Sequence, residues 1–310
     1  MNTLNIIKQG HMSVTGPEGQ LLETRFADVV VIGAGHAGTA AARAAAESGA
    51  KVIVLEAQQL AGFSVSDSSG GCYTGINARF LRRRGAGEAD LQQLTETVCA
   101  KISGYPAQML TREGLLSCGE TLDWLLEPVS SRMRDRISMR NERKNAGMEE
   151  LVGEPVWRAL CRGTVSFPAA QLCAMEYGTA PDDLSSAVKC NQAAACTLGA
   201  VFHFGITAQN LEEQDAVIAA VTGKDGQGRL WRFCAAKAVI LTTGKAADGG
   251  NALRVDETLH VLDAEGRQVK GLLAAGACTG TDTRYWPDEG VAMAWTLGRL
   301  AGNAAVHQKG

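Results

Sequence analysis

The stretch DVVVIGAGHAGTAAARAAAESGAKVIVLE, residues 28–56, decides the fold of this 310-residue chain. Asp28 to Ile32 is a short, β-branched, apolar run, which predicts a strand buried on both faces. Thr39 to Ser48 is an alanine-rich helix that Gly49 ends, and Lys51 to Leu55 is a second buried strand. The stretch therefore predicts one strand–helix–strand unit of a parallel sheet.

The turn between the first strand and the helix reads GAGHAG, residues 33–38, and matches the pattern GxGxxG. The first glycine allows the tight bend, the second lets a pyrophosphate approach the backbone, and the third lets helix and strand pack closely. Glu56 ends the second strand, where its carboxylate can accept both ribose hydroxyls, which argues against a 2′-phosphate. The predicted dinucleotide-binding residues of this unit are Gly33, Ala34, Gly35, Ala37, Gly38, Glu56 and Ala57.

The rest of the chain predicts one α/β domain around a different middle segment. We expect a flexible lead-in at 1–26 and a Rossmann-like domain at 27–310 that combines a parallel sheet, helices and a β-hairpin or meander. The core of the domain is expected in 27–90 and 190–310, and 91–189 as a largely helical segment. The elements expected after the middle segment are a helix at 192–198, strands at 200–204, 216–222, 230–233, 238–241 and 271–275, and a helix at 290–305.

The composition limits the classes of function. The formal net charge of −3 gives no general attraction to nucleic acid or an anionic membrane, and no apolar run reaches the length of a transmembrane helix. Nine cysteines are scattered from Cys72 to Cys278 without a CxxC pair, which favours reduced thiols and no metal site. Residues 1–26 lack the pattern of a signal peptide, so we expect a cytoplasmic protein.

Three further stretches resemble motifs of one flavoprotein family. Residues 239–244, VILTTG, resemble the VILATG strand end of two-dinucleotide flavoproteins, and residues 271–276, GLLAAG, resemble their GLYAAGE strand. Residues 289–294 and 298–302 resemble the closing helix whose N-terminus faces the flavin. In this order, and covering nearly the whole chain, the motifs resemble the fumarate reductase/succinate dehydrogenase flavoprotein family. That family also holds urocanate reductases and 3-ketosteroid dehydrogenases, and the resemblance implies FAD rather than NAD.

The same resemblance extends the predicted FAD-binding set. Residues 61–64, AGFS, resemble the family's Gly-Gly-x-Ser, and residues 70–71 its following glycine pair. Respiratory members carry a histidine near the position of Ser64 that bonds covalently to the flavin, so we expect FAD to be bound non-covalently here. The residues added are Gly62, Phe63, Ser64, Gly70, Gly71, Ala208, Thr243, Gly244, Gly276, Ala277, Gly290, Val291 and Ala292.

Two departures from the family pattern bear on function. The family places an acid after GLYAAG to hold the ribitol, and Ala277 stands there instead, which removes a hydrogen bond worth roughly 1.5–3 kcal/mol. The family also inserts a capping domain between VILATGG and the hairpin before GLYAAGE. Only residues 245–270 fill that interval here, so we expect no full capping domain.

Without the cap, the loop 280–287 supplies the candidate catalytic residues. The resemblance implies that this loop borders the substrate pocket. Arg284 could hold a carboxylate, and Tyr285 could donate a proton or a hydrogen bond. The alternative is that Arg284 is an ordinary exposed loop residue.

Two histidines are expected to have structural positions. His36 lies within the glycine turn and is expected to be an exposed residue at the start of the helix. His203 is expected to be a core or edge-strand residue rather than a ligand.

Three hypotheses about function stay open. The first is an FAD-dependent oxidoreductase that reduces or forms a C–C double bond beside a carbonyl or carboxylate, as the resemblance implies. The second is a steroid-type FAD dehydrogenase, in view of the loop Tyr285-Trp286-Pro287. The third is a cap-less flavin-binding subunit that needs a partner chain. The expected partners are a small-molecule substrate and either an electron donor or a partner subunit, with neither nucleic acid nor membrane.

Overall fold

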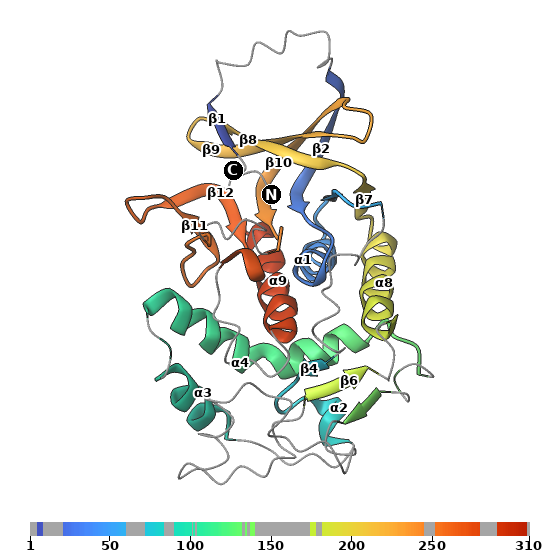
Figure 1. Cartoon of the computed structure of the whole chain (residues 1–310), viewed down its shortest axis with the longest axis vertical. Coiled ribbons are helices and arrows are strands. Elements are labelled where there is room, and N and C mark those ends of the chain that lie inside the picture. Colours follow the sequence, from blue (N-terminus) through green and yellow to red (C-terminus); the bar gives the residue numbers. More distant parts are fainter. Residues whose placement is uncertain are drawn as a thin grey trace. The chain divides into compact units, whose positions relative to one another are not determined.

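The chain forms two compact units, which are described separately (Figure 1). The first comprises Met1–Ser64, Gln192–Gly280 and Gly298–Gly310, and the second Val65–Asn191 and Thr281–Leu297. In this division residues 65–90 group with the middle segment rather than with the expected core. The domain boundaries expected above stay a prediction. The computed structural model describes residues 5–8, 21–59, 72–83, 90–100, 102, 104–131, 134, 137–139, 174–177, 182–244, 252–279 and 290–308.

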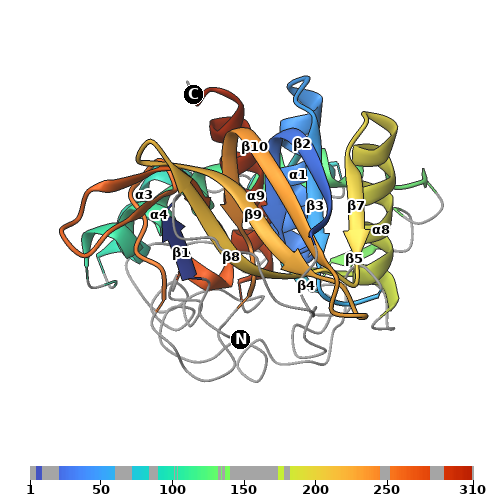
Figure 2. The ribbon, with the colours of Figure 1, turned by 90° about the horizontal axis from the view of Figure 1, so that it is seen from above.

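The first unit is built on one nine-stranded sheet. Its strands are β1 (Asn5–Lys8), β2 (Leu21–Ile32), β3 (Val52–Glu56), β7 (Val201–Phe204), β8 (Thr207–Gln214), β9 (Val217–Lys224), β10 (Leu230–Leu241), β11 (His260–Leu262) and β12 (Gln268–Ala274). They run in the order β1-β8-β9-β10-β2-β3-β7, and β12, which pairs with β11, joins through β10. Figure 2 shows the parallel strands β10, β2, β3 and β7 side by side. The expected α/β class with a parallel-rich sheet is confirmed.

The predicted strand–helix–strand unit is present as β2, α1 (His36–Glu47) and β3. β2 and β3 pair in parallel from Val29 beside Val52 to Ile32 beside Leu55. The side chains of the β-branched run Val29–Val31 are fully buried, as are most alanines of α1. Burial on both faces explains why this strand carries an unbroken apolar run rather than an alternating one.

Helices α1 and α9 pack closely through two glycines of α9. The last helix, α9 (Val291–Val306), starts in the second unit and continues into the first. A Cβ on its Gly298 would lie 2.3 Å from the Ala37 carbonyl oxygen, and one on Gly302 would lie 2.3 Å from that of Ala41. The two glycines therefore let the backbones of α9 and α1 touch, one turn apart.

The sheet differs from the sequence expectation in three places. β8 was not expected, and the strands expected at 230–233 and 238–241 are one strand, β10, whose pairing with β2 shifts register between Ala235 and Ala238. β1 and the first six residues of β2 fall in the expected lead-in. Backbone pairing with β8 and β10 holds these segments in the sheet. Their sequences, NIIK and LLETRF, have neither an unbroken apolar run nor a regular alternation that would predict a strand.

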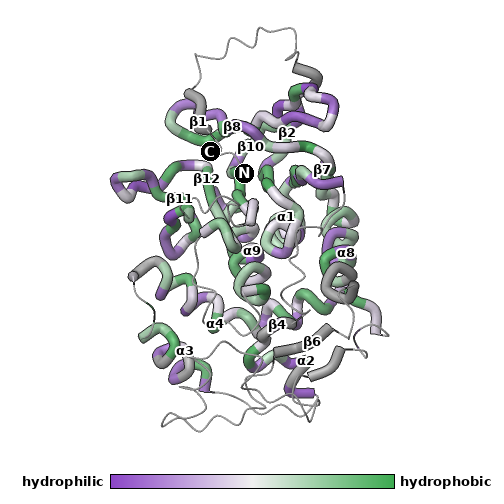
Figure 3. The backbone as a smooth tube through the Cα atoms, in the orientation of Figure 1, coloured by the Kyte–Doolittle hydropathy of each residue, from purple (hydrophilic) through white to green (hydrophobic). Residues whose placement is uncertain are grey.

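The tip of the β11–β12 hairpin is hydrophilic, as its purple colour shows (Figure 3). Arg267 bonds there to Asp263 and Glu265, with nitrogen–oxygen distances of 2.8 Å and 3.0 Å. Among the described residues of the interval 245–270, β11 and the start of β12 pair as an antiparallel hairpin. The expected lack of a full capping domain stays a prediction.

The second unit combines helices with a small sheet. Its helices are α2 (Arg79–Arg82), α3 (Leu91–Cys99), α4 (Tyr105–Leu126), the first part of α8 (Asp182–Thr197) and the first part of α9. Its antiparallel sheet consists of β4 (Cys72–Thr74), β6 (Ala174–Tyr177) and β5 (Ile137–Met139). The middle segment, expected to be largely helical, contains two strands at 137–139 and 174–177 as well as helices among its described residues.

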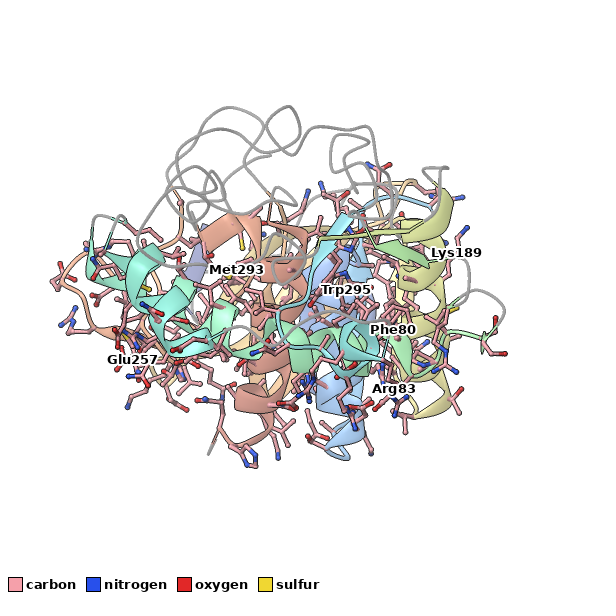
Figure 4. The ribbon with its side chains drawn as sticks, turned by 90° about the horizontal axis from the view of Figure 1, so that it is seen from below. Phe80, Arg83, Lys189, Glu257, Met293 and Trp295 are labelled. Atoms are coloured by element: carbon pink, nitrogen blue, oxygen red, sulfur yellow. The ribbon has the colours of Figure 1, made fainter. Side chains whose placement is uncertain are left out.

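One carboxylate links two helices of the second unit. Asp123 of α4 accepts the N–H groups of Arg79 and Phe80 at 2.8 Å and 2.9 Å, which caps the start of α2. Figure 4 labels Phe80, and it also labels Met293 and Trp295 of α9. Met293 and Trp295 are fully or almost fully buried.

Among the helices that the structure describes, none is both long and apolar enough to cross a membrane.

Candidate functional site

The turn at residues 33–38 has the close contacts that its pattern predicts. Gly33 has a φ of +105°, and a Cβ there would lie 2.6 Å from the Thr242 carbonyl oxygen. A Cβ on Gly38 would lie 1.8 Å from the Gly33 carbonyl oxygen. Neither position can carry a side chain unless the backbone moves, so both glycines are required sterically.

The N-terminus of α1 has two features of an anion-binding helix start. Gly35 is the N-cap, and within the described structure no side chain caps the helix and no acidic residue lies in its first turn. The first N–H groups of a helix lack intrahelical acceptors, and the helix dipole adds positive potential there. These are the groups that bind the pyrophosphate of a dinucleotide.

Glu56 lies at the end of β3, only 8% exposed, and its two carboxylate oxygens face different backbone donors. One oxygen accepts the Ala34 N–H at 2.8 Å, and the other accepts the Gln58 N–H at 2.9 Å. Each oxygen keeps acceptor capacity, because a carboxylate oxygen can accept two hydrogen bonds. The carboxylate is therefore fixed at the turn and still able to accept ribose hydroxyls. Ala57 follows it and is exposed.

Two buried side chains that the sequence analysis did not single out hold the carbonyl of Ala34. The Thr39 hydroxyl donates to the Ala34 oxygen at 3.1 Å, and the Gln192 amide donates to the same oxygen at 3.2 Å. Gln192 also donates to the Thr39 oxygen at 3.3 Å. Thr39 had a weak signal as a hydroxyl residue in an alanine-rich helix, whereas Gln192, on α8, had none.

Thr242 holds the first peptide of the turn. Its hydroxyl lies 2.8 Å from the Ile32 carbonyl oxygen and 3.0 Å from that of Gly33, and its N–H donates to Ile32 at 2.9 Å. In the motif VILATG an alanine stands at this position, so the comparison of VILTTG with that motif was a signal that the sequence analysis left unused.

The ends of three strands bring further predicted residues to the same edge of the sheet. β10 pairs in parallel with both β2 and β12, so the carboxyl ends of the three strands lie together. Thr243 and Gly244 follow β10, and Gly276 and Ala277 follow β12. Gly244 and Gly276 have φ values of +75° and +81°, which favour glycine. The strand ends that face the glycine turn are thus those predicted for FAD.

Cys278 closes the edge between β10 and β12. Its sulfur lies 3.3 Å from the carbonyl oxygens of both Leu241 and Ala275, which share the single thiol hydrogen. Burial raises the pKa of this thiol to about 11, so it stays protonated at neutral pH and acts as a small packing residue.

Ala208 lies close in the chain to a segment bonded to the end of β3. The Ile206 N–H donates to the Glu56 carbonyl oxygen at 2.9 Å, and the Gly205 N–H donates to that of Gln58 at 3.0 Å. Ala208 follows in β8, partly exposed. Its assignment to the FAD-binding set stays a prediction.

Of the remaining ten predicted residues, three lie in the second unit and seven lie outside the described residues. Gly290, Val291 and Ala292 lie at the start of α9 in the second unit, where Gly290 has a φ of +91° and the other two are buried. The other seven lie outside the described residues: Gly62, Phe63, Ser64, Gly70, Gly71 and the candidate catalytic residues Arg284 and Tyr285.

The expectation that His36 is exposed is wrong. The residue is only partly exposed, and both of its ring nitrogens are buried. Burial lowers the pKa of His36 to about 4, so its ring is neutral at neutral pH and adds no positive charge at the turn.

His203 lies on an edge strand, as expected. Its ring centre is 5.4 Å from that of Phe233 and 6.1 Å from that of Trp231. Burial, and then the charge of Arg25, lower its pKa.

Together these features fit FAD. The turn accepts no side chain at Gly33 and Gly38, the start of α1 presents N–H groups, and Glu56 is fixed where a ribose acceptor is needed. The residues that would hold the pyrophosphate and ribose are therefore in place, and they come from β2, α1 and β3.

Comparisons with known proteins agree with this fit. The fold is similar to 3-ketosteroid-Δ4-(5α)-dehydrogenase from Rhodococcus jostii RHA1, with a TM-score of 0.70 and 14% identity over 93% of this chain and 98% of that one. It is also similar to the open conformation of a flavocytochrome c3 fumarate reductase, with a TM-score of 0.65 and 11% identity over 91% of this chain and 78% of that one. No curated protein sequence matches the chain. The narrower resemblance to the fumarate reductase/succinate dehydrogenase family stays a prediction. The sequence model of the FAD dependent oxidoreductases matches residues 28–279, and the chain belongs to that family.

Proposed function

We propose that this FAD-dependent oxidoreductase forms or reduces a C–C double bond next to a carbonyl or carboxylate group. The observation that carries the proposal is the fold similarity, over more than nine tenths of the chain, to a 3-ketosteroid dehydrogenase and a fumarate reductase. Both names describe this chemistry: a double bond conjugated to a ketone in one case, and one between two carboxylates in the other.

Bound FAD accepts or supplies the hydride of such a reaction. In the oxidative direction the substrate loses a hydride and a proton and gains the double bond, and in the reductive direction both are returned. The chain's own contribution in the described residues is to fix the cofactor: the turn at 33–38 and α1 bind its pyrophosphate, and Glu56 orients its adenosine ribose. A single GxGxxG occurs in the sequence, so we infer that the second electron carrier is a small molecule or another protein.

The loop at 280–287 is the proposed source of substrate contacts. Arg284 would hold a carboxylate or polarise a ketone, and Tyr285 would move the proton, as the family resemblance suggests. If Arg284 acts on a carboxylate, an acidic substrate depends on it more than a neutral ketone does.

Two substrate classes follow, and one observation favours each. The larger TM-score and the 98% coverage of the ketosteroid enzyme favour a cyclic enone or saturated ketone. The motif resemblance favours a dicarboxylate such as fumarate. We expect slow fumarate turnover by the chain alone, below roughly 1 per second, because we expect no full capping domain that would exclude water and supply a proton donor.

The test is an anaerobic reoxidation assay. The flavin is reduced with dithionite without excess, and fumarate or a steroid 4-en-3-one is added while the absorbance of oxidised flavin is followed. Reoxidation by either compound supports the proposal, and the faster one identifies the substrate class. Reoxidation by neither would contradict the proposal for the chain acting alone, and would leave the hypothesis of a subunit that needs a partner chain.

A pair of arginine variants tests whether Arg284 holds the substrate carboxylate or is an ordinary loop residue. Arg284→Ala should slow reoxidation by fumarate at least tenfold, a loss of about 1.4 kcal/mol of transition-state stabilisation. Arg267→Ala removes an arginine with a side chain 74% exposed on the β11–β12 hairpin and should have no effect. Equal rates for wild type and Arg284→Ala would show that Arg284 is an ordinary loop residue.

A further inference from the structure

The two peptide groups that flank Ala34, the middle residue of the first Gly-x-Gly, are held by buried side chains. The Ala34 N–H donates to Glu56. The Ala34 carbonyl oxygen accepts from both Thr39 and Gln192. Thr39 is fully buried, and Glu56 and Gln192 are each 8% exposed. Water therefore competes little for these hydrogen bonds.

The hydrogen bonds to the Ala34 carbonyl also set the direction of the next N–H. The peptide between Ala34 and Gly35 is planar and trans, so its C=O and its N–H point in opposite directions. Because the Ala34 oxygen faces the buried network, the Gly35 N–H faces away from it. Gly35 is partly exposed and is the N-cap of α1, at the place where a pyrophosphate binds in this kind of turn.

Gln192 fixes the direction of the hydrogen bond that the Thr39 hydroxyl donates. Its amide nitrogen has two hydrogens, which are directed to the Ala34 oxygen and to the Thr39 oxygen. With its oxygen accepting from Gln192, the Thr39 hydroxyl uses its only hydrogen toward Ala34. Without Gln192, the Ala34 carbonyl would lose one of these two donors, and the Thr39 hydroxyl would be free to rotate.

We propose that Gln192 is a positioning residue for the pyrophosphate of FAD. It acts through Thr39 and Ala34, and it holds the peptide whose N–H, that of Gly35, faces the phosphate. Gln192 lies on α8, 158 residues from Ala34 in the sequence, so a helix outside the strand–helix–strand unit completes the cofactor cradle. The proposal rests on the cofactor and does not depend on which substrate is oxidised or reduced.

The competing explanation is that Gln192 only ties α8 to the sheet. Its neighbour Asn191 provides a control, because it is also a buried amide on α8. The Asn191 amide donates instead to the Leu125 and Ala187 carbonyl oxygens, at 3.1 Å and 2.9 Å. Asn191→Leu should therefore weaken the helix and leave the turn unchanged, whereas Gln192→Met, of similar length but without donors, should act on the turn.

The experiment compares three probes by isothermal titration of the apoprotein: FAD, ADP and adenosine. Gln192→Met should raise the Kd of FAD and of ADP about fivefold, the effect of one hydrogen bond. The Kd of adenosine, which has no phosphate, should stay within about twofold. The phosphorus resonances of bound FAD should shift in Gln192→Met and not in Asn191→Leu. Thr39→Val should give the same changes, and the double variant should not add to them, since both residues belong to one network.

Three outcomes would overturn the proposal. The first is an unchanged Kd for FAD and unchanged phosphorus resonances in Gln192→Met. The second is an equal loss of affinity for adenosine, which would mean a general distortion of the site. The third is the same loss of FAD and ADP affinity in Asn191→Leu, which would assign the effect to α8 as a whole.

Discussion

At the scale of single residues, the space around a glycine shows whether that position must be glycine or could accept a side chain. Gly38 has an ordinary φ, so only space limits it, and a Cβ would lie 1.8 Å from the Gly33 oxygen. Gly226 also has an ordinary φ, and a Cβ on it would have no neighbour within 4 Å. A Cβ is therefore excluded at Gly38, which is buried in α1, and accepted at Gly226, which is exposed in a turn.

Gly38→Ala should abolish or strongly weaken FAD binding, and we expect a stability loss of about 1–3 kcal/mol from overpacking. Gly226→Ala should leave FAD affinity and the midpoint of thermal unfolding unchanged, and is the matched control. FAD titration and thermal unfolding of both variants check this. Normal FAD affinity in Gly38→Ala would show that the turn can open without losing the cofactor.

The buried ring of His36 predicts a pH dependence of stability. Burial lowers its pKa to about 4 in the folded protein, against 6.5 in the unfolded chain. Between these values the unfolded chain binds the proton that the folded protein excludes, so stability falls as the pH falls through this window. The contribution is fully present above pH 6.5 and is lost toward pH 4.

From about pH 7 to about pH 5, His36 should account for a loss of about 2 kcal/mol in the free energy of unfolding. Urea unfolding of the apoprotein at both pH values measures it. His36→Asn should show a smaller loss, whereas His307→Asn, at an exposed position, should behave like the wild type. An equal loss in wild type and His36→Asn would mean that the ring does not titrate as its burial implies.

At the scale of elements, a charged pair crosses over β9 and ties β8 to β10. Arg232 of β10 lies opposite Thr222 of β9, and Glu212 of β8 lies opposite Ala220 of the same strand. The Arg232 guanidinium donates to one Glu212 oxygen through two nitrogens, at 2.8 Å and 2.7 Å. The hydrogen bond to Glu212 raises the pKa of Arg232. The Glu212 side chain is only 10% exposed, so it depends on this partner.

Removal of the arginine should therefore cost more than removal of both charges. Arg232→Met leaves a buried carboxylate and should lower the free energy of unfolding by about 2–4 kcal/mol. Adding Glu212→Gln should recover part of that loss, and urea unfolding of the four proteins in the cycle measures the coupling. Arg267→Met, on the exposed hairpin tip, should change stability by less than about 0.5 kcal/mol. No recovery in the double variant would mean that Arg232 stabilises by packing alone.

At the scale of the whole molecule, the purified protein should carry FAD without a covalent bond. The reason is the resemblance of residues 61–64 to a motif in which covalent members have a histidine near the position of Ser64. Acid precipitation should leave a yellow supernatant, and mass spectrometry under denaturing conditions should give the mass of the polypeptide alone. Flavin that remains in the pellet, or a polypeptide heavier by one FAD, would contradict this prediction.

The sequence by itself determined the elements whose signals are local. Residues 28–56 predict two strands, a helix and the turn between them, because burial on both faces demands unbroken apolar runs and the turn demands glycine. The same local patterns also predicted Glu56 and the glycines of the turn at residues 33–38. It failed where the local pattern is weak: β1 and the start of β2 mix polar and apolar residues, β8 is mostly polar, and backbone pairing with other strands holds all three segments.

Only the tertiary structure showed which side chains from distant parts of the sequence hold the turn at residues 33–38. Gln192 and Thr242 reach the turn from α8 and β10 and bond to carbonyls more than 150 residues away. Thr242 differs from the alanine of the motif VILATG, but that difference does not say which carbonyl the threonine meets, and nothing in its local sequence marks Gln192. The burial of His36 is of the same kind, because its position in the turn is a local property, whereas its exposure depends on what packs over it. Local patterns specify elements, and long-range contacts specify which polar groups meet, because hydrogen-bond geometry is set only when the elements have packed.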